Sequence, residues 1–154
     1  MITIERLKKH PESIPRCAEI WHEVLGKIWM PEFGIEEIES LYYEELKHDM
    51  PLTYIALDGG IPVGSCTLEL NGSIRPDLGP WIGDLVVDPK YQRQGVGKML
   101  LNATIEKAKE LGFEKVYLFA FDPTIPEYYG RLGWRKISMD EFKSHPVTVM
   151  EVAF

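Results

Sequence analysis

The sequence predicts a mixed α/β (α+β) fold, in which a mostly antiparallel sheet of about seven strands is flanked by about four helices. Segments that alternate apolar and polar residues, as strands do, are interleaved with segments whose apolar residues recur at helical spacing. Turn-forming residues separate these segments, with 13 Gly and 11 Pro in the chain. Because 154 residues suffice for one sizeable core, we expect a single domain over residues 1–154.

The first half of the chain is expected to hold one strand, two helices and a hairpin. In order, these are an edge strand at 1–6, a helix from Ser13 to Pro31, a helix at 35–50, and strands at 52–57 and 61–71. Asp58-Gly59-Gly60 predicts the hairpin turn, because glycine supplies the positive φ angles that such turns need.

The second half begins with a loop at 72–80 that is rich in Gly, Pro, Asp and Ser. The expected elements after it are a strand at 81–87, a helix at 95–111, a strand at 116–121, a helix at 126–132, and strands that begin at Trp134 and at Thr148. The run Leu85-Val86-Val87 is typical of a strand buried on both faces. In the long helix, Val96, Met99 and Leu100 are predicted to face the core.

Composition and charge exclude several function classes. The net charge is 17 − 24 = −7, so nucleic acid is not expected as a partner, whereas a cationic amine is compatible. No apolar run approaches the ~18 residues of a membrane helix, and residues 1–6 lack a signal-peptide layout, so we expect a cytoplasmic protein away from membranes. The two cysteines, Cys17 and Cys66, form no disulfide framework and are expected to be core thiols.

The most informative segment runs from Leu85 to Lys98, where a buried strand leads through a glycine-containing turn into a long helix. Its pattern is Gln92-x-x-Gly95-x-Gly97. Unpaired N–H groups and the helix dipole make such a helix start an anion site, and glycines let a phosphate approach the backbone. The pattern lacks the Gly-Lys-Ser/Thr of a P-loop and the third glycine of a dinucleotide fingerprint. A pyrophosphate group fits this chemistry.

This pattern resembles the acetyl-CoA-binding motif of the GCN5-related N-acetyltransferase (GNAT) family. A second block, Tyr128-Tyr129-Gly130-Arg131-Leu132-Gly133-Trp134, is similar to the family's Phe-Tyr-x-x-x-Gly-Phe segment. The two blocks occur in the family's order and together cover roughly a third of the chain. The resemblance implies the family's fold and an acetyl-CoA-dependent N-acetyltransferase.

The resemblance also implies how acetyl-CoA binds, as a cosubstrate and without a metal. In such enzymes two neighbouring strands splay apart, and the pantetheine arm pairs with one of them, here through Leu85, Val86 and Val87. The pyrophosphate rests on backbone amides at the helix start, here those of Gln92, Arg93, Gln94, Gly95, Val96, Gly97 and Lys98. A backbone N–H near Val87, at a bulge, is the implied donor to the carbonyl oxygen.

The resemblance makes Tyr129 the general acid that protonates the leaving thiolate, and we expect Tyr128 to be a packing residue. Asp84, on the strand beside the cofactor, and Glu69, on the preceding strand, are candidate bases and expected cross-strand neighbours. The same two acids would also suit binding of a cationic substrate. Where the family often carries an asparagine cofactor contact, this chain offers Asp122.

The acceptor is expected to be a primary amine of a small molecule or a peptide, attacking the thioester directly in a ternary complex. The aromatic loop at 28–33 is predicted to act as a lid or pocket wall, and the loop at 73–80 flanks the same side. A homodimer is compatible with the final strand. The alternative to an enzyme is a non-catalytic acyl-CoA-binding sensor on the same fold, and a longer acyl donor also remains open.

Overall fold

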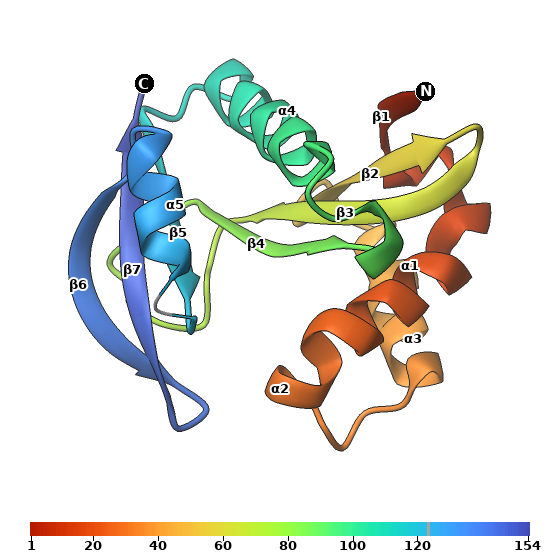
Figure 1. Ribbon diagram of the computed structural model, residues 1–154, viewed down its shortest axis with the longest axis horizontal. Helices are drawn as coiled ribbons and strands as arrows, with labels where there is room; N and C mark the ends of the chain where they lie inside the picture. Colours follow the sequence, from red (N-terminus) through yellow and green to blue (C-terminus); the bar gives the residue numbers. More distant parts are fainter. Residues whose placement is uncertain (123) are drawn as a thin grey trace.

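A computed structural model describes residues 1–122 and 124–154 as a seven-stranded mixed sheet flanked by helices (Figure 1). The strand order is β1-β2-β3-β4-β5-β7-β6, and every pairing is antiparallel except that of β4 with β5. The strands are β1 (Ile2–Arg6), β2 (Leu52–Asp58), β3 (Ile61–Glu69), β4 (Trp81–Val87), β5 (Lys115–Ala120), β6 (Arg135–Phe142) and β7 (His145–Ala153).

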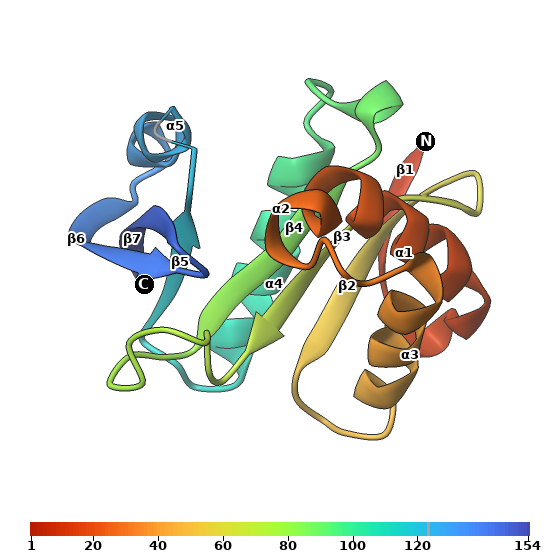
Figure 2. The same cartoon turned by 90° about the horizontal axis from the view of Figure 1, so that it is seen from below.

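The helices lie on both faces of the sheet (Figure 2). They are α1 (Ile14–Trp21), α2 (Lys27–Trp29), α3 (Ile35–Glu45), α4 (Val96–Glu110) and α5 (Ile125–Arg131), with a π-helical turn at His22–Gly26 and 3-10 turns at Leu7–Lys9, Pro11–Ser13 and Pro89–Tyr91. The seven strands and the four longer helices α1, α3, α4 and α5 confirm the predicted fold class.

Alternation along the central strands divides the apolar core between the two faces. On β2, Ile55 and Leu57 pack with α1 and α3 on one face, whereas Leu52 and Ala56 join the cluster formed with α4 on the other. Leu100, fully buried on α4, anchors the second cluster. The sheet is therefore held between helices on both sides.

Three sequence-based expectations about these elements were wrong. The first predicted helix does not run unbroken to Pro31, because a π-helical turn interrupts it after Trp21. Met99 is exposed rather than in the core, because it falls on the outer side of α4. Leu85 and Val87 are only half-buried, because one face of β4 borders a hollow rather than packed side chains.

The separation of β4 and β5 is the feature that makes room for a site. These parallel strands are registered at a single pair, Trp81 with Tyr117, and diverge beyond it (Figure 1). One edge of β4 beyond Trp81 is therefore left without a neighbouring strand in the described chain.

A β-bulge lies on the same strand. Ser65 pairs with Val86 and Thr67 with Gly83, so Asp84 and Leu85 together stand opposite one residue of β3. Asp84 has a positive φ of 53°. The prediction that placed the bulge near Val87 is thus wrong, since it occurs two to three residues earlier.

Candidate active site

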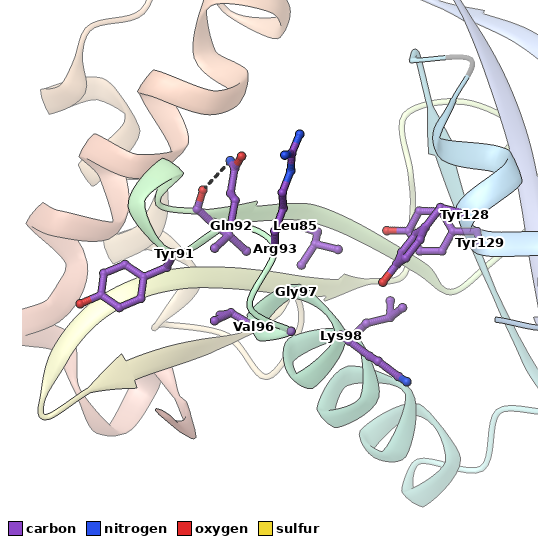
Figure 3. Close-up of a pocket in the computed structure, with 12 residues that line it drawn as sticks. Leu85, Tyr91, Gln92, Arg93, Val96, Gly97, Lys98, Tyr128 and Tyr129 are labelled. Carbon is purple, nitrogen blue, oxygen red and sulfur yellow. Dashed lines mark hydrogen bonds between the residues drawn. The ribbon is translucent and has the colours of Figure 1, made fainter. Parts of the chain in front are cut away.

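A hollow of about 300 Å³ opens where β4 leads into α4 (Figure 3). Its walls include Leu85 and Val87 on β4, and Tyr128 and Tyr129 on α5. The turn before α4 and its first residues also contribute, namely Gln92, Arg93, Gly95, Val96, Gly97 and Lys98. Among the described lining residues, the charged ones are Arg93 and Lys98, both basic. In a chain of net charge −7, this is a local site suited to an anion.

The start of α4 presents unpaired backbone donors to this hollow. The first helical bond runs from the Met99 N–H to the Gly95 carbonyl at 3.1 Å, so the N–H groups of Val96, Gly97 and Lys98 have no partner within the helix. Gly95 precedes the helix with φ of 84°, which favours glycine. A Cβ at Gly97 would meet only Val87 Cγ2, at 3.8 Å, which leaves the approach to its amide open.

The turn before α4 is fixed by side-chain bonds to backbone carbonyls. Gln92 Nε2 donates to the Val87 carbonyl at 3.1 Å, as Figure 3 shows, and Gln94 Nε2 donates to that of Lys90 at 3.2 Å. Gln94 thus braces the turn and does not line the hollow. The other predicted cofactor-binding residues line the hollow, except Val86, whose side chain is buried in the core. Those that line it are Leu85, Val87, Gln92, Arg93, Gly95, Val96, Gly97 and Lys98.

Tyr128 and Tyr129 approach the hollow from α5, on the far side from the start of α4 (Figure 3). Tyr129 is buried and stacks edge-on against Trp134, with ring centroids 5.6 Å apart. Burial, followed by the proximity of Cys66 and Tyr128, raises the pKa of the Tyr129 phenol, so it carries its proton at neutral pH. Tyr128 was expected to be a packing residue, and its ring lies edge-on to that of Tyr129 at 5.5 Å. It is also 45% exposed and lines the hollow.

A larger cavity of about 520 Å³ adjoins this hollow and shares Leu85, Tyr128 and Tyr129 with it. We call it the acceptor cavity. Its walls are largely aromatic, and its carboxylates are Glu69 and Asp84. Trp29, which was predicted to lie in a loop, ends helix α2 and lines this cavity. Four rings lie edge-on to it, those of Phe119 at 6.2 Å, Phe121 at 5.4 Å, Phe142 at 5.1 Å and His145 at 5.4 Å.

The two acids reach this cavity from different positions in the sheet. Glu69 is registered with Trp81 rather than with Asp84, so the expectation of cross-strand neighbours was wrong. The bulge nevertheless brings both side chains to the same cavity. Asp84 Oδ1 accepts a hydrogen bond of 3.0 Å from Trp21 Nε1, which fixes its orientation.

Burial sets the protonation of these acids. Burial and then the neighbouring charges of Asp84 and Glu45 raise the pKa of Glu69 to about 8. Burial also raises the pKa of Asp84, against the opposing effect of the Trp21 hydrogen bond. A raised pKa makes the ionised form of each carboxyl a stronger base. Because the pKa of Glu69 is about 8, Glu69 acts as a base only in its ionised fraction at neutral pH.

Sequence analysis missed Glu45, Trp21 and the hairpin between β6 and β7. Glu45 lies on α3, yet its charge raises the pKa of Glu69. Burial, and then the charge of Asp84, raise the pKa of Glu45 itself to about 7, against the opposing effect of the Thr53 hydrogen bond. Phe142 and Lys143 of the hairpin line the acceptor cavity, and Lys143 Nζ donates to the Trp29 carbonyl at 2.6 Å. No local pattern marked these residues, because they meet only through the tertiary fold.

Other candidate groups have structural roles. Cys17 and Cys66 are buried thiols, as expected, and burial raises the pKa of each to about 12, so neither is a thiolate nucleophile. Asp122 accepts bonds from the N–H and Oγ1 of Thr124 ahead of α5. Within residues 1–122 and 124–154, no cluster of three metal-ligating side chains and no helix able to span a bilayer is found.

Comparison with known proteins identifies the family. Residues 15–134 match the acetyltransferase (GNAT) family. A protein from Prochlorococcus marinus, described as an uncharacterized N-acetyltransferase ycf52-like, is 40% identical over 53 residues. That match covers 34% of this chain and 29% of the relative, so it spans less than a third of the relative's length.

Solved structures share the fold across the chain. A chimera of the Vibrio cholerae spermidine N-acetyltransferase SpeG with hSSAT matches with a TM-score of 0.77, at 17% identity, over 99% of this chain and 95% of the other. A PaiA N-acetyltransferase from Thermoplasma acidophilum, solved with coenzyme A, matches with a TM-score of 0.66, at 19% identity, over 100% and 99%. The family match over residues 15–134 establishes that the chain belongs to the acetyltransferase (GNAT) family, a family of N-acetyltransferases.

Proposed function

We propose that this protein transfers the acetyl group of acetyl-CoA directly to a primary amine of a small molecule or peptide. The observation that carries the proposal is the pair of adjoining hollows. One is basic, beside the start of α4, and the other is acidic and aromatic, beside the free part of β4. The boundary between them, at Leu85, Tyr128 and Tyr129, is where an acyl group and an amine would meet.

The residues of the basic hollow suit the chemical groups of acetyl-CoA. The unpaired N–H groups of Val96, Gly97 and Lys98, with the charges of Arg93 and Lys98, would hold the pyrophosphate. The backbone of β4 from Leu85 to Val87, which no strand covers on one edge, would pair with the amides of the pantetheine arm. Bound in this way, acetyl-CoA supplies an activated acyl group.

The acceptor cavity supplies groups for the reaction itself. An ammonium must first lose a proton, and Glu69 and Asp84 are the carboxylates placed to take it. The neutral amine nitrogen then bonds to the acyl carbon and forms a tetrahedral oxyanion. The nitrogen loses its second proton to water, and the carbon–sulfur bond breaks as the carbonyl re-forms. Tyr129 would give its proton to the departing sulfur and recover one from solvent. Backbone N–H groups at the Asp84–Leu85 bulge are the donors proposed for the developing oxyanion.

The experiment measures ligand binding and enzymatic turnover on the same protein sample. Thermal stability is measured with acetyl-CoA, CoA, NAD and ATP, and a ligand at ~100 times its dissociation constant adds ~2.7 kcal/mol of stability. Free thiol release is then followed with acetyl-CoA and a panel of primary amines. We expect stabilisation by acetyl-CoA and CoA alone and amine-dependent thiol release. Stabilisation without thiol release from any amine would instead support a non-catalytic acyl-CoA sensor.

The acceptor cavity favours the enzyme over the sensor. A protein that only senses acyl-CoA needs the basic hollow, but it does not need a second cavity with two carboxylates beside the acyl group. Here that cavity is the larger of the two, at about 520 Å³ against about 300 Å³.

A further inference from the structure

A third cavity, which we call the side arm, lies along α3 beside the acceptor cavity. It has a volume of about 330 Å³ and shares Trp21, Met30 and Asp84 with the acceptor cavity as lining residues. The acceptor cavity in turn meets the basic hollow at Leu85 and the two tyrosines. The three hollows therefore form a series, with Asp84 between the reaction centre and the side arm.

The side arm has apolar walls and a negative interior. Ile38, Leu41 and Tyr42 of α3 line it together with Trp21, Met30 and Pro51. Its acidic residues are Glu44, Glu45 and Asp84, and His48 also lines it. No Lys or Arg is found among the described residues that line it. A partly aliphatic, cationic group fits these walls, whereas an anion does not.

Glu45 is the carboxyl that remains free for a cation. Glu44 lies at the surface, 3.1 Å from Lys47 Nζ and 3.6 Å from His48 Nε2. Glu45 forms no ion pair within the described chain and accepts a hydrogen bond only from Thr53 Oγ1, at 2.8 Å. Thr53 is itself held by Thr67 Oγ1 at 2.8 Å, so the carboxyl is fixed in place.

We propose that the acceptor is a linear aliphatic diamine or polyamine, whose reacting amine lies beside Asp84 and whose second ammonium occupies the side arm and pairs with Glu45. This inference rests on the proposed function, because it assigns the substrate class of the same site. It makes Glu45 a specificity-determining residue that does not contact the reacting atoms.

The energetics of buried acids support this assignment. A partly buried carboxylate without a counter-charge is costly. The charge of Asp84 raises the pKa of both Glu45 and Glu69, and the charge of Glu45 raises that of Glu69. Two ammonium groups on one flexible chain would neutralise both ends of the series at once. The methylene chain between them would contact the apolar walls of Trp21, Met30 and Tyr42. A monoamine of the same length would leave Glu45 unpaired.

The wild-type protein provides the first test. Thiol release from acetyl-CoA is measured with α,ω-diamines of two to eight carbons and with n-alkylamines of matched length. We expect kcat/KM to pass through a single optimum along the diamine series. At that optimum the diamine should exceed its matched monoamine by about tenfold to a hundredfold, the range of a charge-assisted bond.

A charge-removing variant provides the second test. Glu45→Gln keeps an acceptor for Thr53 Oγ1 and should raise the KM of the best diamine by about tenfold or more relative to that of the matched monoamine. Because Glu45 also raises the pKa of Glu69, any change in kcat should be the same for both substrates. Glu39→Gln makes the same charge change on α3, where the residue lines none of the three hollows, and should leave the diamine advantage intact. Thermal melting confirms that both variants fold.

Failure of the inference is distinguishable from failure of the proposed function. If monoamines and diamines are acetylated equally well at every length, the protein is an N-acetyltransferase but the side arm does not bind a second ammonium. If Glu45→Gln weakens both substrate classes equally, Glu45 is structural and the assignment is wrong. If acetyl-CoA releases no thiol with any amine, the proposed function fails and the inference falls with it.

Discussion

Replacing Gly97 with alanine should change stability and acetyl-CoA affinity in opposite senses. Gly97 lies in the first turn of α4, and its built Cβ meets only Val87 Cγ2, at an ordinary 3.8 Å. Alanine therefore fits the ligand-free protein and restricts the unfolded chain, which stabilises by about 0.4–1 kcal/mol. At roughly 2–4 °C per kcal/mol for a chain of this size, Tm should rise by about 1–4 °C.

The same methyl group would stand where the pyrophosphate is proposed to lie. It would weaken one charge-assisted bond from the backbone N–H groups, worth about 1.5–3 kcal/mol, so the Kd for acetyl-CoA should rise by about 10- to 150-fold. Differential scanning fluorimetry without ligand gives the first quantity, and calorimetric titration with acetyl-CoA and CoA gives the second.

Gly130→Ala is the matched control for this experiment. Gly130 is also helical, on α5, and a Cβ there has no atom within 4 Å, but it lines none of the hollows. This variant should gain stability without losing affinity. Wild-type acetyl-CoA affinity in a stabilised Gly97→Ala protein would refute the placement of the pyrophosphate at this helix start.

Four further substitutions and one pH profile test the rest of the site. Tyr129→Phe should lower kcat by about 10²-fold or more and leave the Kd for acetyl-CoA unchanged. The control variant Tyr128→Phe should retain kcat. Equal effects of the two variants on kcat in steady-state assays would reject Tyr129 as the general acid. Gly95→Glu should weaken acetyl-CoA binding by at least about tenfold. The φ of 84° at this position favours glycine, and the new carboxylate would repel the phosphate groups. Undiminished binding in a titration would show that the anion site does not lie at this turn. Burial raises the pKa of Glu69 from 4.5 to about 8. Between these two pH values the folded state holds more protons than the unfolded chain. The free energy of unfolding should therefore fall as pH rises. Thermal melts from pH 5 to 8 should show this decline, and Glu69→Gln should flatten it; an unchanged slope in that variant would contradict the assignment.

Local sequence patterns predicted the elements that depend on neighbours in the chain. Strand β4 occupies the expected 81–87, and the turn at Gly59-Gly60 has the positive φ values that its glycines indicated. The start of α4 was also predicted, because its two glycines and basic residues lie within one short segment. In each case the determining interactions span only a few residues.

The acceptor side could be predicted only in part, because its residues meet through long-range packing. Asp84 and Glu69 were identified from their positions on neighbouring strands, but the bulge that orients Asp84 follows from pairing with β3. Glu45 is contributed by α3, about 40 residues from Asp84 in sequence, and no pattern on an amphipathic helix distinguishes a cavity-facing acid from a solvated one. The exposure of Tyr128 to the hollow likewise depends on how α5 packs against the sheet.

The single registered pair between β4 and β5 makes a narrow connection between two parts of the sheet. Strands β1 to β4 form one bonded group, and β5, β7 and β6 form another, joined within the sheet at Trp81 and Tyr117. The bond from Lys143 Nζ to the Trp29 carbonyl links the β6–β7 hairpin to the other side of the acceptor cavity. A donor molecule bound between the strands, as proposed, would contact both groups beside that cavity. We therefore expect the protein to bind its two substrates in order, with acetyl-CoA first.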